Sequence, residues 1–213
     1  MSTEYPKIPT LFARNLDFSL NTTQFKHPVL GTISKWRTTE KIHGMNIRVI
    51  VEGGGDSVVF KGRTDAAVLP GPLEQELQRL FPIVDRIRNA AFSYPGHIVL
   101  YGEGYGGKIQ QGTLYSVSQK FILFDAKVGH SWLSLEELKV FADALQIDIV
   151  PELQTMSIPE IVDMVKTPFK SVIGSALAEG VVAQPISPLF NNYGTPLRIK
   201  LKTSDFTKHR GGV

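Results

Sequence analysis

Several short segments of the chain alternate apolar and polar residues, as is typical of β-strands. After Gly44, apolar residues occupy every second position from 45 to 51, which predicts a half-buried strand. Lys41 would then lie on the short segment that leads into this strand. The stretch "VEGGGDSVVFKGR" predicts a hairpin with its turn at 53–56 and a returning strand over 58–60.

Further strands follow along the chain. "HIVLYGEGYGG" reads as a strand that runs into a glycine-rich loop, and "KFILFDAKV" reads as another strand. Towards the C-terminus, "EGVVAQP" and "LRIKLKTSDF" predict two short strands joined by a loop rich in Asn, Pro and Gly. Residues 1–30, with three prolines, are expected to be irregular, and residues 33–51 are expected to contain the first strand pair or extended segment.

The clearest helical pattern runs from Pro72 to Phe92, because proline suits a first turn and leucines recur at a spacing of three to four residues. Phe81-Pro82 is expected to kink this helix. Two further helices are predicted by capping boxes, in which a serine precedes a glutamate by three residues. Ser134 would cap the helix in "LSLEELKVFADAL", and Ser157 would cap the helix "IPEIVDMVK".

Strands outnumber helices and are mostly joined locally, which predicts an α+β fold with largely antiparallel sheet. The 213 residues include 42% hydrophobic and 20% charged residues, which suits one ordinary globular domain spanning 1–213. No apolar run reaches the length of a membrane span and the N-terminus does not resemble a signal peptide, so we expect a cytoplasmic protein. The chain has no cysteine, which excludes disulfides, thiolate metal sites and a cysteine nucleophile.

Charged residues interrupt or end the predicted strands. Burying such charges costs several kcal/mol each, as an order of magnitude, unless they are paired or bound to a ligand. Lys200 and Lys202 are two residues apart, so on a strand they point to the same side. Each residue alone also fits a plainer role, such as a solvated turn or an edge-strand lysine, but the set suggests a pocket for phosphates and a divalent cation. The members are Glu40, Lys41, Arg63, Glu103, Asp125, Glu179, Lys200 and Lys202. The net charge of +3 permits a nucleic-acid partner without requiring one.

Five of these segments follow one another in a characteristic order: "EKIHG", "YGEG", "FILFD", "EGVV" and "IKLK". In this order they resemble the motifs of the covalent nucleotidyltransferases, which are nucleic-acid ligases and messenger-RNA capping enzymes. "TEKIHGMN", "GGKIQQG" and "LKTSDF" more narrowly resemble the RNA ligase 2 family of T-even phages and kinetoplastid editing ligases. DNA ligases and capping enzymes usually have aspartate where this chain has His43. The resemblance spans about residues 33–206, and Met45 departs from it, since threonine is usual there.

The resemblance implies an ATP-grasp-like nucleotidyltransferase fold, with mainly antiparallel sheets flanked by helices and the nucleotide pocket between them. It implies that Lys41 is the nucleophile that takes AMP from ATP, while Lys200 and Lys202 hold the phosphates. Nearby positive charge and burial would favour the neutral form of a lysine nucleophile. Gly44 would leave room for the backbone to turn beside the nucleotide. The implied reaction has three steps: formation of lysyl-AMP, transfer of AMP to an RNA 5′-phosphate, and attack by a 3′-hydroxyl.

Carried over by matching position, a second set of residues would contact the nucleotide, and a divalent cation would complete the site. Glu40 and Asn46 are assigned to the nucleoside, Arg63 to the ribose or phosphates, Glu103 to the ribose and Phe124 to stacking on adenine. Ile42 and Val181 belong to the same nucleotide-binding set. Mg²⁺ or Mn²⁺ would be held by Glu179 and Asp125.

The leading interpretation is an ATP-dependent RNA ligase that seals nicked or duplex-held RNA ends. A DNA ligase or a GTP-using capping-type enzyme remains an alternative, as does a non-catalytic module that binds nucleotide or RNA. Family members commonly carry a further C-terminal domain, and none is expected here because only "TKHRGGV" follows Phe206. An accessory protein, or Lys208, His209 and Arg210 in this tail, could then help to hold the nucleic acid.

Overall fold

A computed structural model describes residues 3–52, 57–81, 97–110 and 112–207. The α+β class with antiparallel sheets is confirmed. The chain divides into two compact units: unit 1 contains Met1–Tyr5 and His43–Val150, and unit 2 contains Pro6–Ile42 and Pro151–Val213. The basic tail that begins at residue 208 lies outside the described residues. Among the described helices, none combines the length and the apolar character needed to cross a bilayer.

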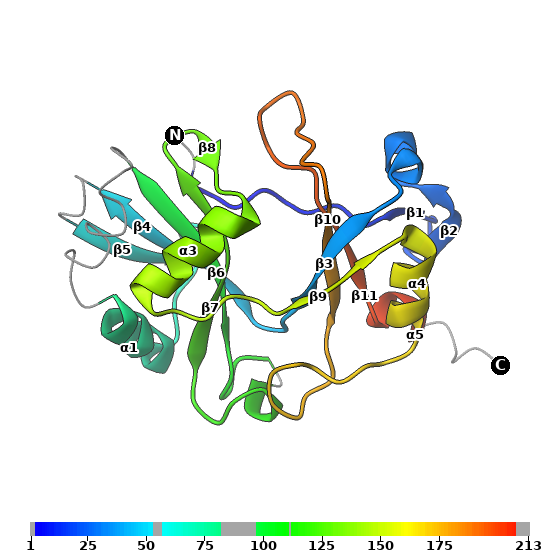
Figure 1. Ribbon diagram of the computed structural model, residues 1–213. Helices are drawn as coiled ribbons and strands as arrows, with labels where there is room; N and C mark the ends of the chain where they lie inside the picture. Colours follow the sequence, from blue (N-terminus) through cyan, green and yellow to red (C-terminus); the bar gives the residue numbers. More distant parts are fainter. Residues whose placement is uncertain (1–2, 53–56, 82–96, 111, 208–213) are drawn as a thin grey trace. The chain divides into compact units, whose positions relative to one another are not determined.

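Unit 1 is built on a five-stranded antiparallel sheet with the order β5-β4-β6-β7-β8. Its strands are β4 (Met45–Glu52), β5 (Ser57–Gly62), β6 (Ile98–Tyr105), β7 (Lys120–Val128) and β8 (Ser131–Trp132) (Figure 1). Pairing of Glu52 with Ser57 confirms the predicted hairpin, although its turn at 53–56 lies outside the described residues. The strand β6 includes the whole "YGEG" stretch, so Glu103 lies within the strand.

The strand β4 is buried on both faces over residues 47–51, so the expectation of a half-buried strand is wrong. Ile47 and Val49 pack into the main core of unit 1, whereas Ile50 packs with Tyr101 and Tyr5 on the other face. The alternating pattern could not reveal this second layer, because it includes a tyrosine from the N-terminal segment. Lys41 is also placed differently from the prediction: it is the last residue of the preceding strand, β3 (Trp36–Lys41).

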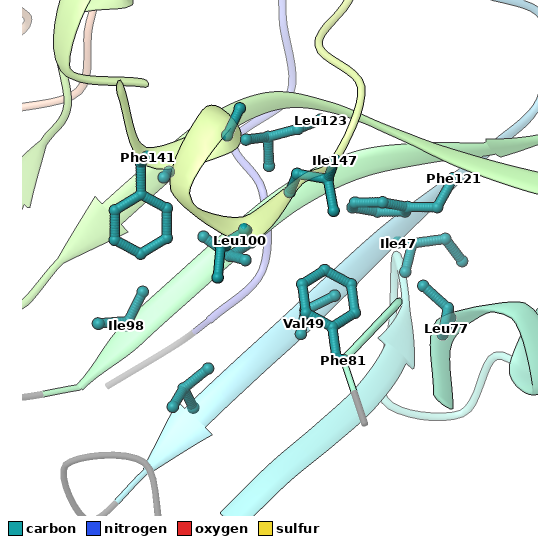
Figure 2. Packing of buried hydrophobic residues seen from close by; sticks show 14 of the residues in the cluster. Ile47, Val49, Leu77, Phe81, Ile98, Leu100, Phe121, Leu123, Phe141 and Ile147 are labelled. Atoms are coloured by element: carbon teal, nitrogen blue, oxygen red, sulfur yellow. The ribbon is translucent and has the colours of Figure 1, made fainter. Parts of the chain in front are cut away.

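The main core of unit 1 lies between one face of the sheet and two helices, α1 (Gly71–Leu80) and α3 (Leu135–Leu145). Figure 2 shows Leu77 of α1, Phe81 just after it and Phe141 of α3 packed with Val49 and Leu100 from the sheet. On the opposite face of the sheet, the described residues that pack together come from strands and the N-terminal segment, and that face carries most of the residues predicted to contact the nucleoside.

The helix α1 ends at Leu80, directly before the kink expected at Phe81-Pro82. Phe81 has φ −118° and ψ 54°, which is not helical, because a following proline disfavours the helical conformation. Residues 82–92 of the predicted helix lie outside the described residues. Both predicted capping boxes are present: Glu137 accepts a hydrogen bond from Ser134 N–H at 2.7 Å, and Glu160 accepts one from Ser157 N–H at 2.6 Å.

Unit 2 contains a four-stranded antiparallel sheet with the order β11-β10-β3-β9. Besides β3, its strands are β9 (Glu152–Met156), β10 (Gly180–Pro185) and β11 (Ile199–Lys202). The helix α4 (Ile158–Lys166) packs against one face of this sheet, where Trp36, Ile161 and Leu201 are buried in a common core. A short helix, α5 (Ser204–Thr207), follows β11.

The expectation that residues 1–30 are irregular is wrong. The strands β1 (Phe12–Arg14) and β2 (Leu20–Phe25) form an antiparallel pair, and a 3₁₀-helix follows at Pro28–Thr32. The rings of Phe12 and Phe25 stack with centroids 5.5 Å apart, and Leu11 and Leu30 are buried in the core of unit 2. The regular structure of β1 and β2 depends on this packing. The two strands are too short to show an alternation of apolar and polar residues in the sequence.

Gly102 in β6 is required by close packing. A Cβ atom there would overlap the ring of Phe121 and the carbonyl oxygen of Ile122 on the neighbouring strand β7. We therefore predict that Gly102→Ala lowers the free energy of unfolding by about 1–3 kcal/mol, the usual range for overpacking a core. Gly71→Ala is the matched control, since a Cβ at Gly71 meets nothing within 4 Å. Urea denaturation of both variants tests this, and equal stabilities would contradict it.

Candidate active site

The register of three strands in unit 2 places the predicted catalytic residues side by side. Gly180 at the start of β10 pairs with Lys41 at the end of β3, and on its other side it pairs with Lys202 of β11. Glu179 directly precedes Gly180 in the chain. Strands in one sheet lie about 4.8 Å apart, so both lysines are within side-chain reach of Glu179.

The two lysines share the carboxylate of Glu179. Lys41 Nζ donates to Glu179 Oε2 at 2.6 Å, and Lys202 Nζ lies 2.5 Å from Glu179 Oε1. The Glu179 side chain is 12% exposed, compared with 21% for Lys41 and 36% for Lys202. Lys41, the predicted nucleophile, is therefore partly shielded from water, and the ammonium of Lys202 contacts the same carboxylate.

Glu179 carries the negative charge of this cluster. Burial opposes its ionisation, but the charges and hydrogen bonds of Lys41 and Lys202 outweigh burial and lower the pKa of the Glu179 carboxyl below its ordinary value. At neutral pH the carboxylate is therefore ionised. One negative and two positive charges leave the cluster with a positive balance, which favours an anionic ligand such as a phosphate group.

Gly180 allows the strands to approach closely. A Cβ atom at this position would overlap the carbonyl oxygen of Leu201 and lie 2.8 Å from the Cα atom of Lys202. Any other residue would push β10 away from β11 and separate Glu179 from Lys202. The glycine of the "EGVV" motif therefore sets the geometry of the cluster.

Lys200 lies on the same face of the sheet as Lys202, as their spacing predicts. Ile199 and Leu201, which alternate with them, are buried in the core of unit 2. The main-chain N–H of Lys200 donates to the Pro9 carbonyl at 3.0 Å, which fixes the outer side of β11. Since burial alternates in the same way along β3, Lys41 also lies on the face away from the core.

Glu40 differs from Lys41 in its direction. Its side chain is buried, and its Oε2 atom accepts a hydrogen bond from the main-chain N–H of Val172 at 2.8 Å. Its Oε1 atom is buried and has no hydrogen-bond partner among the described residues. Ile42 and Val181 are also buried, and Val181 packs into the core of unit 2. Their predicted contact with a nucleotide would therefore fall to their main-chain atoms.

In unit 1 the predicted nucleoside residues gather on one sheet face. Asn46 of β4 lies directly opposite Glu103 of β6, so their side chains are neighbours. The Oδ1 atom of Asn46 is buried and accepts no hydrogen bond within the described part of the chain. Gly44 allows this contact, because a Cβ there would overlap the carbonyl oxygen of Gly104 and lie 2.9 Å from Glu103 Cγ. Close strand packing therefore accounts for this glycine.

A β-bulge in β7 brings Phe124 and Asp125 to the same side. Tyr101 pairs with Asp125 while Gly102 pairs with Leu123, so Phe124 is the extra residue. The Asp125 carboxylate is buried and accepts hydrogen bonds from Tyr5 O–H at 2.9 Å and from Ala126 N–H at 3.0 Å. Tyr5 also meets Phe124 edge to face, with ring centroids 5.0 Å apart. Asp125 therefore anchors the N-terminal segment, and its role as a metal ligand stays a prediction.

Sequence reasoning missed two residues of unit 1, Tyr5 and Arg48. Tyr5 stood in a stretch expected to be irregular, and Arg48 looked like an ordinary polar position of a half-exposed strand. Arg48 is in fact fully buried beneath the turn that carries Arg63. A charged residue inside an otherwise apolar strand is a signal that could have identified Arg48. No comparable signal marks Tyr5.

The donor set available for a cation is small. Over the described ranges, no three His, Cys, Asp or Glu residues come together as a metal site. Mg²⁺ usually keeps several waters and is bound through one or two carboxylates together with substrate phosphates. The single carboxylate of Glu179 beside two lysines suits a cation that arrives with phosphates, and a preformed cage of protein ligands is not required.

Comparisons with known proteins identify a family and a fold. A family model described as RNA ligase matches residues 34–202. Among solved structures, RNA ligase of Naegleria gruberi with PPi matches with a TM-score of 0.62 at 20% identity, over 96% of this chain and 64% of that one. A mutant of that ligase with AMP and Mn matches with a TM-score of 0.63 at 18% identity, over 96% and 63%. This chain thus spans slightly less than two thirds of the ligase chains, and identities this low show the fold alone. No curated protein sequence matches the chain.

The charge cluster predicts a pH-dependent contribution to stability. A carboxyl whose pKa is lowered by folding stabilises the protein above its unfolded pKa, and this contribution is lost as the pH falls through the folded pKa. We expect Glu179→Gln to lower the free energy of unfolding by about 1–2 kcal/mol at pH 7, since both lysines are partly exposed. The difference from the wild type should shrink below the ordinary glutamate pKa. Urea denaturation at pH 7 and at acidic pH measures this, and a difference independent of pH would contradict it.

Proposed function

The chain belongs to the RNA ligase family, and from this premise we propose that it is an ATP-dependent RNA ligase whose covalent nucleophile is Lys41. The observation that carries the proposal is the sharing of the Glu179 carboxylate by Lys41 and Lys202 in unit 2. The matched range 34–202 includes all three residues. A lysine at the end of a strand, partly shielded and beside a second cation, is suited to attack on a phosphate.

In the first step, Lys41 Nζ would attack the α-phosphorus of ATP. A phosphorus–nitrogen bond forms, the bond from the α-phosphorus to the bridging oxygen breaks, and pyrophosphate leaves with the electron pair. Lys41 must lose a proton first, since an ammonium has no free electron pair. Glu179 holds the Lys41 side chain in place, and its Oε2 atom, which accepts a hydrogen bond from Lys41 Nζ, is within reach to accept that proton.

Lys200 and Lys202 are suited to the phosphates. Both lie on the face of β11 away from the core, and the exposed fraction of Lys202 leaves its ammonium accessible to a ligand. Two cations on one face can offset charge that develops on the leaving pyrophosphate. A divalent cation, Mg²⁺ or Mn²⁺, held by Glu179 and accompanied by the phosphates, would supply further positive charge there. Asp125 remains the second predicted ligand.

The nucleoside assignments draw support from two unpartnered acceptors. Glu40 Oε1 and Asn46 Oδ1 are buried and have no hydrogen-bond partner within the described residues. Buried polar atoms are normally satisfied, so each fits a ligand that donates hydrogen bonds. The ribose hydroxyls and the adenine amino group are donors of this kind. Phe124 would stack on adenine, a contact worth roughly 1–3 kcal/mol, and Glu103 would bind the ribose.

A single adenylation domain over residues 1–213 stays part of the proposal, with its predicted residues distributed over the two units. Unit 2 carries the nucleophile and the phosphate-binding lysines, and unit 1 carries Asn46, Arg63, Glu103 and Phe124. The later steps would pass AMP to an RNA 5′-phosphate and join it to a 3′-hydroxyl, at a nick or a duplex-held end. An accessory protein that adds nucleic-acid contacts, and a cytoplasmic location, belong to this proposal as well.

Substitution of the nucleophile tests the first step. Lys41→Ala should abolish covalent labelling by α-³²P-labelled ATP, and Lys41→Arg should do so too, because arginine keeps the charge but does not deprotonate near neutral pH. Lys26→Ala, at an exposed lysine, is the control and should label normally. The protein is incubated with labelled ATP or GTP and Mg²⁺ or Mn²⁺, then separated on a denaturing gel. Labelled Lys41→Ala protein would refute the assignment, and labelling by GTP alone would favour a capping-type enzyme.

Sealing assays separate an RNA ligase from its alternatives. We expect the protein to join a nick with RNA ends faster than the same nick made of DNA. The Lys41→Ala variant should still join a pre-adenylated nick, since that substrate bypasses lysyl-AMP. Contacts to phosphates should make sealing fall steeply as salt rises. Nick sealing is followed over a series of salt concentrations at constant enzyme. A preference for DNA ends would favour a DNA ligase, and labelling without any sealing would restrict the function to adenylation.

A further inference from the structure

Arg48 is a fully buried arginine for which adenylation provides no direct role. It lies in the middle of β4, and its guanidinium makes three hydrogen bonds within unit 1. Arg48 Nε donates to the Gly62 carbonyl at 2.8 Å, Nη2 donates to Asp65 Oδ1 at 2.9 Å, and Nη1 donates to Thr3 Oγ1 at 2.7 Å. A buried charge is tolerated only when its donors are satisfied in this way.

Two of these three hydrogen bonds hold a single turn, and that turn carries Arg63. Gly62 directly precedes Arg63, and Asp65 follows two residues later, so the guanidinium of Arg48 holds both ends of the short segment 62–65. The same turn is closed by the Ala67 N–H, which donates to the Thr64 carbonyl at 3.2 Å. Lys61 Nζ adds a contact to Asp65 Oδ1 at 3.1 Å.

Arg63 itself is exposed, and the structure gives it no hydrogen bond or ion pair with any described residue. The turn is therefore held firmly on both sides of an arginine whose own guanidinium is available. Because a long side chain loses conformational freedom when it binds, a fixed backbone beneath it reduces the cost of binding an anion.

We propose that Arg48 is a positioning residue: through Gly62 and Asp65 it fixes the turn that presents Arg63 to the phosphates or ribose of ATP. The inference rests on the proposed function, because it requires ATP to be the ligand. Arg48 does not touch the nucleotide in this scheme and acts through Arg63 alone. The fork of the guanidinium matters, since it contacts two points of the turn at once, which a lysine ammonium at this position would not reproduce.

The test is a double-mutant cycle on the exposed side of the turn, where folding is least at risk. Asp65→Ala removes one of the two contacts between Arg48 and the turn, the hydrogen bond from Nη2, and the Asp65 side chain is 69% exposed. Arg63→Ala removes the ligand contact, and the third variant carries both changes. Asp65→Asn keeps an acceptor oxygen and serves as the conservative rescue. Thr3→Val removes the other contact of Arg48 and is the matched control.

Two readouts are measured on each variant. The first is the ATP concentration that gives half-maximal self-labelling, together with the maximal labelling rate. The second is the affinity for ATP by calorimetry in a Lys41→Ala background, which excludes the covalent step. We expect Asp65→Ala to weaken ATP binding about tenfold, with little change in maximal rate, as for loss of a charge-assisted contact. Asp65→Asn should recover most of this loss, and Thr3→Val should bind ATP as the wild type does.

The cycle decides between positioning and general stabilisation. If Asp65 acts through Arg63, the double variant binds ATP no more weakly than Arg63→Ala alone. Independent, multiplying effects of the two changes would overturn the inference, as would unchanged ATP binding in Asp65→Ala. Urea denaturation confirms that each variant is folded. A folded wild type that neither binds ATP nor becomes labelled would overturn the proposed function itself. If the wild type is labelled but the effects of Asp65→Ala and Arg63→Ala multiply, only the positioning role of Arg48 is overturned.

Discussion

The pairing of β3, β10 and β11 around Gly180 is the constraint on which the proposed chemistry depends. Gly180 is opposite Lys41 on one side and Lys202 on the other, so one carboxylate just before it meets both ammoniums. A shift of one residue in either pairing would turn the side chains of that strand to the other face. The buried residues that alternate with them, among them Val181 and Leu201, fix this register because they must face the core.

In unit 1 the two faces of the five-stranded sheet differ in what they pack against. One face is covered by α1 and α3 and forms an apolar core (Figure 2). The other face carries Asn46 and Arg48 and packs aromatic rings. Arg48 is hydrogen-bonded within unit 1, whereas the buried Asn46 Oδ1 atom has no partner among the described residues and is available to a ligand. Burial of both faces explains why residues 47–51 of β4 are inaccessible to water, and why the arginine among them finds its hydrogen-bond partners within unit 1.

Local signals predicted the parts of the fold that local interactions stabilise. The helices α3 and α4 begin where Ser134 and Ser157 predicted, because a capping box needs only residues three positions apart. The end of α1 at Leu80 also has a local signal, the proline that follows Phe81. The N-terminal strands were missed, because the stacking of Phe12 on Phe25 depends on a turn and a core that no short window of sequence contains.

The sequence by itself determined the order of the motifs, their resemblance to a family and the kinds of side chain available for the chemistry. Lys200 and Lys202 could be assigned to one face from spacing alone, because side-chain direction alternates along any strand. Only the tertiary structure decided that Glu179 joins Lys41 to Lys202, that Glu40 faces away from them and that Tyr5 reaches Asp125. Each of these depends on which distant segments become neighbours. That choice is made by the burial of whole sheet faces, which short sequence patterns do not record.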